Sequence, residues 1–271
     1  MTYKLAIIGH PLTQTLSPLL HNWGFARLGI HAAYLAFPTP PERLEAFIRA
    51  VRALPIAGVS ITIPHKEAVM PFLDGVSDAA KAASAVNTLV WEDGRLMGHN
   101  TDLTGFVAPL LERLESLALK RALVLGAGGA AKAVLAGLEQ LGIADVVVAN
   151  RSLERAEKLA ARFNARAVAW EERVDVCADL VVNATPMGMT GKALDESPLS
   201  PGYWKPGHVA YDLIYNPRET LFLRQAREAN AQTIDGLTMF AAQGAAQFKL
   251  WTGRDLPLDE VHELLARTLY T

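Results

Sequence analysis

The sequence predicts an α/β protein with two units, an amino-terminal α/β domain and a second domain built on a doubly wound parallel sheet. Short apolar segments that fit β-strands alternate with amphipathic segments that fit helices almost from end to end. A glycine-rich turn at residues 126–131 directly follows one apolar segment and leads into a helical segment. The 271 residues suit one large domain or two small ones. The pattern divides into two units joined by a helical stretch from Asp102 to about Glu115.

The first unit contains two segments with clear helical signals. Ser17 followed by Pro18 predicts a helix with Ser17 as N-cap and proline at the first helical position, running to about Leu28 and stopping at Gly29. A second helix is predicted over Pro41–Ala53, because its large apolar residues recur at helical spacing along one face.

Strand signals surround these two helices. Glu92-Asp93-Gly94 is typical of a hairpin turn and separates two apolar runs. The strands predicted for the first unit are Leu5–Ile8, Ala33–Phe37, Gly58–Ile63, Val86–Trp91 and Arg95–Met97.

The second unit opens with a strand–helix–strand–helix series, the usual start of a doubly wound nucleotide-binding domain. Two further strands continue the sheet, and two helices end the chain. Residues 192–206 are rich in proline and glycine and predict a surface loop. The predicted strands are Ala122–Leu125, Asp145–Ala149, Leu180–Ala184 and Val209–Asp212. The predicted helices follow the glycine turn to Leu141 and cover Leu153–Phe163, Gly236–Trp251 and Leu258–Leu269.

Composition excludes several kinds of partner. The net charge is −2 and charged residues make up 20% of the chain, which gives no electrostatic reason to expect nucleic acid or an anionic membrane. The sequence has no run of about 18 apolar residues, so no membrane span is expected. The first residues are too short an apolar stretch for a signal peptide, so the expected location is cytoplasmic.

Cysteine and histidine give no sign of a metal. The single cysteine, Cys177, excludes an intramolecular disulfide and a multi-cysteine zinc site, and we expect it to be a small buried apolar residue. The 7 histidines show no H-x-x-x-H spacing, so no metal site is assigned.

The turn Gly126-x-Gly128-x-x-Ala131 fits the G-x-G-x-x-G/A pattern of dinucleotide-binding domains. The first glycine permits the tight turn, the second lets a pyrophosphate approach the backbone, and the small third residue lets helix and strand pack closely. The phosphates would lie at the helix N-terminus. This context, characteristic of the Rossmann-type fold, predicts a dinucleotide or nucleotide site.

The next strand ends in Asn150 and Arg151, with Arg155 one helical turn further on. Enzymes that use NAD usually place a carboxylate at this strand tip to hold the ribose hydroxyls. Asp145 lies at the wrong end of the strand to do so. Two guanidinium groups can instead hold a 2′-phosphate and stack on adenine, which favours NADP. The alternative is an ordinary solvated basic helix start.

Lys66, Asn87 and Asp102 follow short apolar segments, in S-I-T-I-P-H-K, A-V-N-T-L and G-H-N-T-D. A lysine and a carboxylate at strand ends, with an amide nearby, suit proton transfer to and from a polyhydroxylated small molecule. Together with a dinucleotide site they suggest hydride transfer. Three candidate residues also have ordinary interpretations: Lys66 as a surface lysine, Asp102 as a helix N-cap, and Ser17 as a cap with Thr15 in the preceding loop.

These segments together resemble the shikimate dehydrogenase family over nearly the whole chain. The matching stretches are G-H-P-L-T-Q-T-L-S-P-L-L-H-N (9–22), S-I-T-I-P-H-K-E (60–67), A-V-N-T-L (85–89), G-H-N-T-D (98–102), V-L-G-A-G-G-A (124–130), N-R-S-x-x-R (150–155), N-A-T-P-M-G-M (183–189), Y-D-L-I-Y-N-P (211–217) and D-G-L-T-M-F-A-A-Q-G-A (235–245).

The resemblance implies reversible reduction of 3-dehydroshikimate to shikimate with NADPH, in the chorismate route to aromatic amino acids. It also implies a substrate domain at about residues 1–101, which the C-terminal helices 236–271 rejoin. An NADP-binding Rossmann domain would cover 102–235, with the active site in the cleft between the domains. The partner is then a small molecule, and the protein is expected to be a monomer or a homodimer.

The same resemblance implies roles for individual residues. Lys66 would give and take the proton of the reacting oxygen, with Asp102 paired beside it. Asn87, Thr62 and Gln243 would bind ring hydroxyls, and Thr15, Ser17 and Tyr215 the carboxylate. The cofactor residues would be Gly126, Ala127, Gly128, Gly129 and Ala130 for the pyrophosphate, Asn150, Arg151 and Arg155 for the adenosine phosphate, and Asp78, Leu213 and Gly236 near the nicotinamide half.

Four positions depart from the usual family pattern: Thr15 for serine, Ser60 for asparagine, His65 for an aromatic ring and Leu103 for glycine. None of them removes the Lys66–Asp102 pair. The sequence leaves two rival functions open. One is a broader quinate/shikimate dehydrogenase, and the other is a non-catalytic sensor that binds shikimate or a nucleotide.

Overall fold

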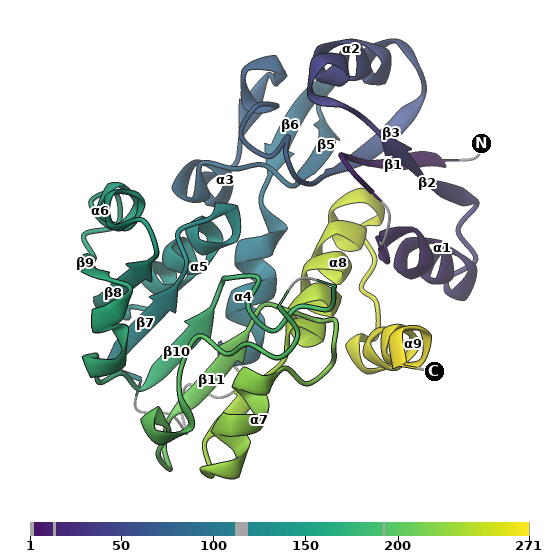
Figure 1. The fold of residues 1–271 in the computed structure, drawn as a ribbon. Helices are drawn as coiled ribbons and strands as arrows, with labels where there is room; N and C mark the ends of the chain where they lie inside the picture. The colour runs from purple at the N-terminus through teal and green to yellow at the C-terminus, as the bar shows by residue number, and fades with distance from the viewer. Residues whose placement is uncertain (1–2, 13–14, 112–118, 192, 271) are drawn as a thin grey trace. The chain divides into compact units, whose positions relative to one another are not determined.

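The computed structural model describes residues 3–12, 15–111, 119–191 and 193–270. The chain divides into two compact units, 1–104 with 241–267 and 105–240 with 268–271 (Figure 1). The domain boundaries predicted from the sequence, after residues 101 and 235, lie close to these divisions, and the assignment of domains stays a prediction.

The first unit contains a mixed six-stranded sheet with the order β2-β1-β3-β5-β6-β4. The strands β1, β2 and β3 run parallel, and β5 is antiparallel to both β3 and β6. The predicted hairpin is therefore confirmed, whereas the short strand β4 was not predicted. The strand bounds are β1 Tyr3–Gly9, β2 Ala32–Pro38, β3 Ile56–Ile61, β4 Gly75–Val76, β5 Thr88–Glu92 and β6 Arg95–His99.

Helices pack on both faces of this sheet. The helix α2 turns Leu44, Ile48 and Val51 toward Ala6 and Ile8 of β1, as its apolar periodicity predicted. The helices with residues in this unit are α1 Ser17–Arg27, α2 Leu44–Ala53, α3 Asp78–Ala83, the start of α4 Thr101–Leu111, and most of α8 Gly236–Thr252 and α9 Leu258–Tyr270.

The opposite face of the first sheet receives α8. Tyr34 and Gly58 are the register partners of Leu5, so they lie on the face opposite Ala6 and Ile8. A Cβ added to Gly58 would overlap the indole ring of Trp251, and the indole Nε1 donates to the carbonyl of Leu89 at 2.9 Å. The absence of a side chain at Gly58 thus lets α8 lie close against the sheet.

The second unit contains a fully parallel six-stranded sheet with the order β12-β11-β10-β7-β8-β9. The strand order reverses between β7 and β10, which is the arrangement of a doubly wound nucleotide-binding fold and confirms the predicted class. The strand bounds are β7 Arg121–Leu125, β8 Asp145–Asn150, β9 Arg166–Ala169, β10 Leu180–Asn183, β11 Val209–Asp212 and β12 Gln232–Ile234. The strands β9 and β12 were not predicted.

The helices α5 Gly129–Gln140, α6 Leu153–Ala160 and α7 Leu221–Glu228 connect these strands. The helix α7 was not predicted, and α6 ends three residues before the expected Phe163, because residues 161–164 form a turn. The helix α4 ends at Leu111 among the described residues, and the predicted stretch 112–115 lies outside them.

For the second unit, the expected burial of Cys177 was wrong, and the expected surface position of the loop 192–206 holds only in part. Cys177 is exposed, because its neighbours Val176 and Ala178 turn into the core and an alternating segment must turn the residue between them outward. The predicted surface loop 192–206, of which residue 192 lies outside the described part, places Leu199 and Trp204 in the same core. The loop is polar and rich in proline overall, but its individual apolar side chains are still buried where they reach the core.

No helix within the described ranges is both long enough and apolar enough to cross a bilayer. The described residues also contain no cluster of three or more His, Cys, Asp or Glu side chains that could hold a metal ion.

Candidate active site

The first unit brings Lys66 and Asp102 together at the end of its sheet where β3 stops. Lys66 lies in the loop that follows β3, and Asp102 lies in the first turn of α4. Lys66 Nζ donates to Asp102 Oδ2 at 2.6 Å. Their side chains are 23% and 17% exposed, so the pair is partly shielded from water and from screening by salt.

The second carboxylate oxygen of Asp102 is held by Asn87. Asn87 Nδ2 donates to Asp102 Oδ1 at 2.9 Å and to Thr101 Oγ1 at 3.0 Å, while its Oδ1 accepts from Thr101 N at 2.8 Å. Both amide hydrogens are therefore used. A hydrogen bond from Asn87 Nδ2 to a substrate hydroxyl would have to replace one of them.

Asp102 is not the N-cap of α4, so that alternative was wrong. Asn100 takes this place, because its Oδ1 accepts from Leu103 N at 3.1 Å. The carboxylate of Asp102 is thereby left to pair with Lys66.

Ser17 is not an N-cap either. The cap position of α1 is Leu16, which already has helical dihedral angles, and no side chain caps this helix. The Ser17 hydroxyl instead lies close to the Tyr34 hydroxyl, and the backbone N–H of Ser17 donates to Thr15 Oγ1 at 3.3 Å. Thr15 and Ser17 thus lie side by side at the start of α1.

The structure places the remaining predicted residues of this unit, Thr62 and Gln243 for the substrate and Asp78 for the cofactor, as follows. Thr62 follows β3 directly, and its methyl group lies against Gly9, where β1 ends. Gln243 is buried on α8. Asp78 lies elsewhere, at the start of α3, where its exposed carboxylate pairs with Lys81 at 3.0 Å.

The glycine turn of the second unit lies at the point where the strand order reverses. Gly126 has a φ of +105°, and a Cβ there would lie 2.9 Å from the carbonyl oxygen of Ala184, which follows β10. A Cβ at Gly128 or Gly129 would meet no described atom within 4 Å, and no side chain caps α5. The residues therefore fit a dinucleotide, because no side chain occupies the N-terminus of α5 and the approach to it at Gly128 and Gly129 is open to a pyrophosphate.

Asn150 and Arg151 lie next to this turn, since Gly126 N donates to Ala149 O at 2.8 Å across from β7 to β8. Ser152 caps α6, which puts Arg155 in the first helical turn. Arg151 and Arg155 are exposed, and among the described residues neither guanidinium has a hydrogen-bonded partner. Two unpaired cations beside a helix N-terminus are unfavourable alone and are suited to an anionic ligand.

Leu213 and Gly236 also lie together in the second unit. A Cβ at Gly236 would be 2.5 Å from the backbone of Ile214 and 2.6 Å from that of Leu213, so only glycine fits there. Tyr215 packs its ring on Phe240 at 5.3 Å, and burial raises the pKa of its hydroxyl.

A buried carboxylate that the sequence analysis did not single out orders this region. Asp212, at the end of β11, accepts hydrogen bonds from Asn183 Nδ2 at 3.1 Å, Ile214 N at 3.0 Å and Thr220 Oγ1 at 2.6 Å. Thr220 in turn caps α7. Burial raises the pKa of Asp212 to about 7, although the three donors act in the opposite direction.

Other missed residues lie beneath the Lys66–Asp102 pair. They form a buried polar cluster around Asn87, made of His21, Tyr34, Ser60, Thr88, Thr101 and Gln247. Two signals in the sequence pointed to it: Thr88 and Thr101 stand next to predicted site residues, and Gln247 is four residues after Gln243, on the same helical face.

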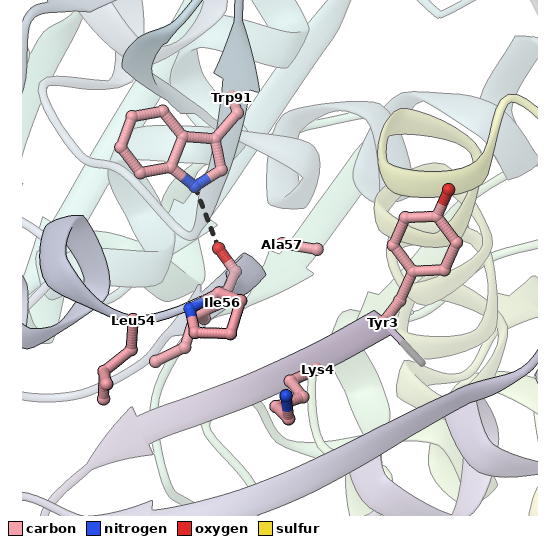
Figure 2. Close-up of a pocket in the computed structure, with 7 residues that line it drawn as sticks. Tyr3, Lys4, Leu54, Ile56, Ala57 and Trp91 are labelled. Atoms are coloured by element: carbon pink, nitrogen blue, oxygen red, sulfur yellow. Dashed lines mark hydrogen bonds between the residues drawn. The ribbon is translucent and has the colours of Figure 1, made fainter. Parts of the chain in front are cut away.

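A separate apolar groove lies at the opposite end of the first sheet, where β1 and β3 begin (Figure 2). Trp91 Nε1 donates to Ile56 O there at 2.9 Å, and Lys4 and Leu54 line the groove. None of the predicted site residues contributes to its lining.

The fold and these residues define a dinucleotide-binding α/β protein with a lysine–carboxylate pair on a separate α/β unit. Models of known families match three parts of the chain. The shikimate dehydrogenase substrate binding domain matches residues 7–89, the shikimate / quinate 5-dehydrogenase model residues 110–188, and the shikimate 5'-dehydrogenase C-terminal domain residues 236–266.

A protein from Oleidesulfovibrio alaskensis named shikimate dehydrogenase (NADP(+)) is 54% identical over 265 residues, which cover 97% of this chain and 94% of the relative. The chain belongs to the shikimate dehydrogenase family. A shikimate 5-dehydrogenase from Thermus thermophilus, solved with NADP(H) and shikimate, superposes with a TM-score of 0.89 at 40% identity and covers 98% of this chain and 100% of that one. A quinate dehydrogenase from Corynebacterium glutamicum, solved with NAD, gives 0.93 at 32% identity over 98% and 99% of the two chains.

The raised pKa of Asp212 predicts how its contribution to stability varies with pH. A folded-state pKa near 7, above the ordinary value of 3.8, means that the folded protein binds this proton more tightly than the unfolded chain. The contribution of Asp212 is therefore fully present below pH 4 and is lost as the pH rises toward 7, by about 1.4 kcal/mol for each unit of pKa shift.

We expect the free energy of unfolding of the wild type, relative to Asp212→Asn, to fall as the pH is raised from 4 to 7.5 in urea denaturation. A relative stability that rises over this range would show instead that the three donors dominate and lower the pKa.

Proposed function

We propose that the protein catalyses the reversible, NADPH-dependent reduction of 3-dehydroshikimate to shikimate, in the chorismate route to aromatic amino acids. The observation that carries the proposal is the pair of Lys66 and Asp102, bonded at 2.6 Å on a unit separate from the dinucleotide fold. The reaction needs a proton donor at a carbonyl oxygen and a hydride donor at the carbonyl carbon. The Lys66–Asp102 pair suits the first role, and the dinucleotide fold would hold the hydride donor. The proposal includes a cytoplasmic enzyme that is a monomer or a homodimer.

Lys66 is assigned the proton transfer. In the direction of reduction its ammonium group gives a proton to the reacting oxygen as negative charge develops there, and in the reverse direction its amine takes the proton of the hydroxyl. Asp102 holds the lysine through Oδ2 and is itself held by Asn87 through Oδ1, so the proton donor is oriented before the substrate arrives. NADPH supplies the hydride when it is bound.

The substrate carboxylate is assigned to Thr15, Ser17 and Tyr215, which are neutral hydroxyl donors. Each such bond to a charged group contributes about 1.5–3 kcal/mol. Ring hydroxyls are assigned to Thr62, Gln243 and Asn87. The adjacency of Thr15 and Ser17, and the place of Thr62 at the end of a strand beside β1, support these roles.

The cofactor is assigned to the second unit, apart from a contact by Asp78. Residues 126–130 receive the pyrophosphate at the uncapped start of α5. Asn150, Arg151 and Arg155 receive the adenosine 2′-phosphate, which their exposed positive charge supports. Leu213 and Gly236, packed backbone to backbone, border the nicotinamide half.

A broader quinate/shikimate dehydrogenase is the second candidate, because the similarity to a solved quinate dehydrogenase favours it. Quinate carries an extra hydroxyl on the carbon that bears the carboxylate. The methyl group of Thr15, where serine is common in the family, is expected to crowd that hydroxyl. We therefore expect shikimate to be the better substrate. The pairing of Lys66 with Asp102 argues against a sensor that binds without turnover.

The direct test is oxidation of shikimate and of quinate, each with NADP and with NAD, followed by absorbance at 340 nm. We expect shikimate with NADP to give the highest kcat/KM.

Lys66→Ala should lower kcat by about 10²–10⁴-fold, because the proton donor is lost. Lys66→Arg keeps the charge and should be similarly impaired, since a guanidinium does not release its proton near neutral pH. Equal kcat/KM values for the two acids would promote the second candidate, and near-native kcat in Lys66→Ala would refute the role of this lysine.

The unpaired arginines predict the cofactor preference. Replacing Arg151 by alanine should raise KM for NADP about tenfold or more and barely change KM for NAD, because one hydrogen bond to the 2′-phosphate is lost. Lys158→Ala, which removes a charge from the other end of α6, serves as the matched control. Added salt should reduce the wild-type preference, because the arginines are exposed. A preference for NAD, or no change in KM on substitution of Arg151, would contradict this assignment.

A further inference from the structure

Gln247 connects α8 to three other elements of the first unit. Its side chain is buried, and its Nε2 donates to the carbonyl of Asn87 at 3.1 Å and to Thr88 Oγ1 at 2.9 Å. Its Oε1 accepts from Ser60 Oγ at 3.0 Å and faces His21 Nε2 at 3.3 Å. All the polar atoms of this amide are thus used within the protein.

The direction of these bonds is fixed on the side of Asn87. Because Gln247 donates to Thr88 Oγ1, the Thr88 hydroxyl turns its own hydrogen to Asn87 Oδ1, at 2.8 Å. With Oδ1 accepting from Thr88 and from the backbone of Thr101, Asn87 Nδ2 must face Asp102. A series of donors therefore runs from Gln247 to the carboxylate that holds Lys66.

The direction is also fixed on the other side of Gln247. Tyr34 donates to Ser60 Oγ at 2.5 Å, which leaves the Ser60 hydroxyl hydrogen for Gln247 Oε1. Burial lowers the pKa of His21 to about 3, so its ring is neutral near pH 7. Its Nδ1 is buried without a partner among the described residues, which assigns the proton to Nε2, facing Gln247. If the Gln247 amide were flipped, its Nε2 hydrogens would face the donor hydrogens of Ser60 and His21.

We propose that Gln247 is a positioning residue, which fixes the Asn87 amide and thereby holds Asp102 and Lys66 in the geometry for proton transfer. This inference rests on the proposed function. Gln247 has no role in contacting substrate, which falls to Gln243 one helical turn earlier. Because the backbone of Thr101 also orients Asn87, we expect the loss of Gln247 to weaken the arrangement rather than abolish it.

Two variants test the proposal. Gln247→Leu removes all four polar contacts, and Gln247→Glu keeps the shape but loses the N–H donors when ionised. Val261→Ala on α9 is the control, because Val261 is fully buried in the same unit and its side chain carries no polar atom. It should lower the melting temperature without changing kcat of the folded fraction.

We expect both Gln247 variants to lower kcat for shikimate oxidation about 10- to 100-fold, the scale for a small misplacement of reacting groups, with KM for NADP unchanged. Activity of Gln247→Glu should recover in part as the pH is lowered and the introduced carboxyl gains a proton to donate. A kcat in Gln247→Leu equal to that of Val261→Ala, at matched folded fraction, would overturn the proposal.

A readout without turnover separates this inference from the proposed function. In ¹⁵N-labelled protein, the side-chain Nδ2 hydrogens of Asn87 should exchange slowly with water in the wild type and in Val261→Ala, and faster in Gln247→Leu. Equal exchange in all three proteins would overturn the positioning role. A wild type that oxidises no shikimate with NADP would refute the proposed function, and the exchange rates would still decide the role of Gln247.

Discussion

The carboxylate of Asp102 is the group on which the first unit's site depends. A partly buried charge is stable only when it is paired and hydrogen-bonded, and each oxygen of Asp102 has one partner, Lys66 on Oδ2 and Asn87 on Oδ1. These partners come from the ends of different elements, so the pair exists only when β3, the segment before β5 and the start of α4 are all in place. The acid–base pair therefore depends on the folded first unit.

The second unit satisfies a different constraint, the close approach of backbone to ligand. Gly126 turns tightly against Ala184, and α5 begins with no side chain over its first N–H groups. Asp212 lies at the end of β11, beside the end of β10, and accepts three hydrogen bonds there. These bonds order the segment that carries Leu213 and Tyr215. At both strand ends a single residue determines the path of the backbone. Gly126 does so because a larger residue would not fit, and Asp212 does so through its hydrogen bonds.

Local patterns in the sequence predicted the long strands, the glycine turn and the motifs that bear Lys66, Asn87 and Asp102. They failed where tertiary packing decides. The strands β9 and β12 are short and lack a distinct apolar run, and Leu199 and Trp204 are buried although their loop is polar. The capping roles of Ser17 and Asp102 were wrong because their side chains lie beside groups distant in the chain, Tyr34 and Lys66. Gln247 was missed for the same reason, since all its partners lie far from it in sequence.

We propose that Lys66 and Asp102 act as one catalytic unit. A double-mutant cycle tests it most directly, with kcat for shikimate oxidation measured in Lys66→Ala, in Asp102→Asn and in the double variant. Asp102→Asn keeps the shape but removes the charge that orients the lysine, so each single substitution should remove most of the same rate enhancement. We expect the double variant to be little worse than the poorer single variant. Losses in kcat that multiply in the double variant would show instead that the two residues act independently.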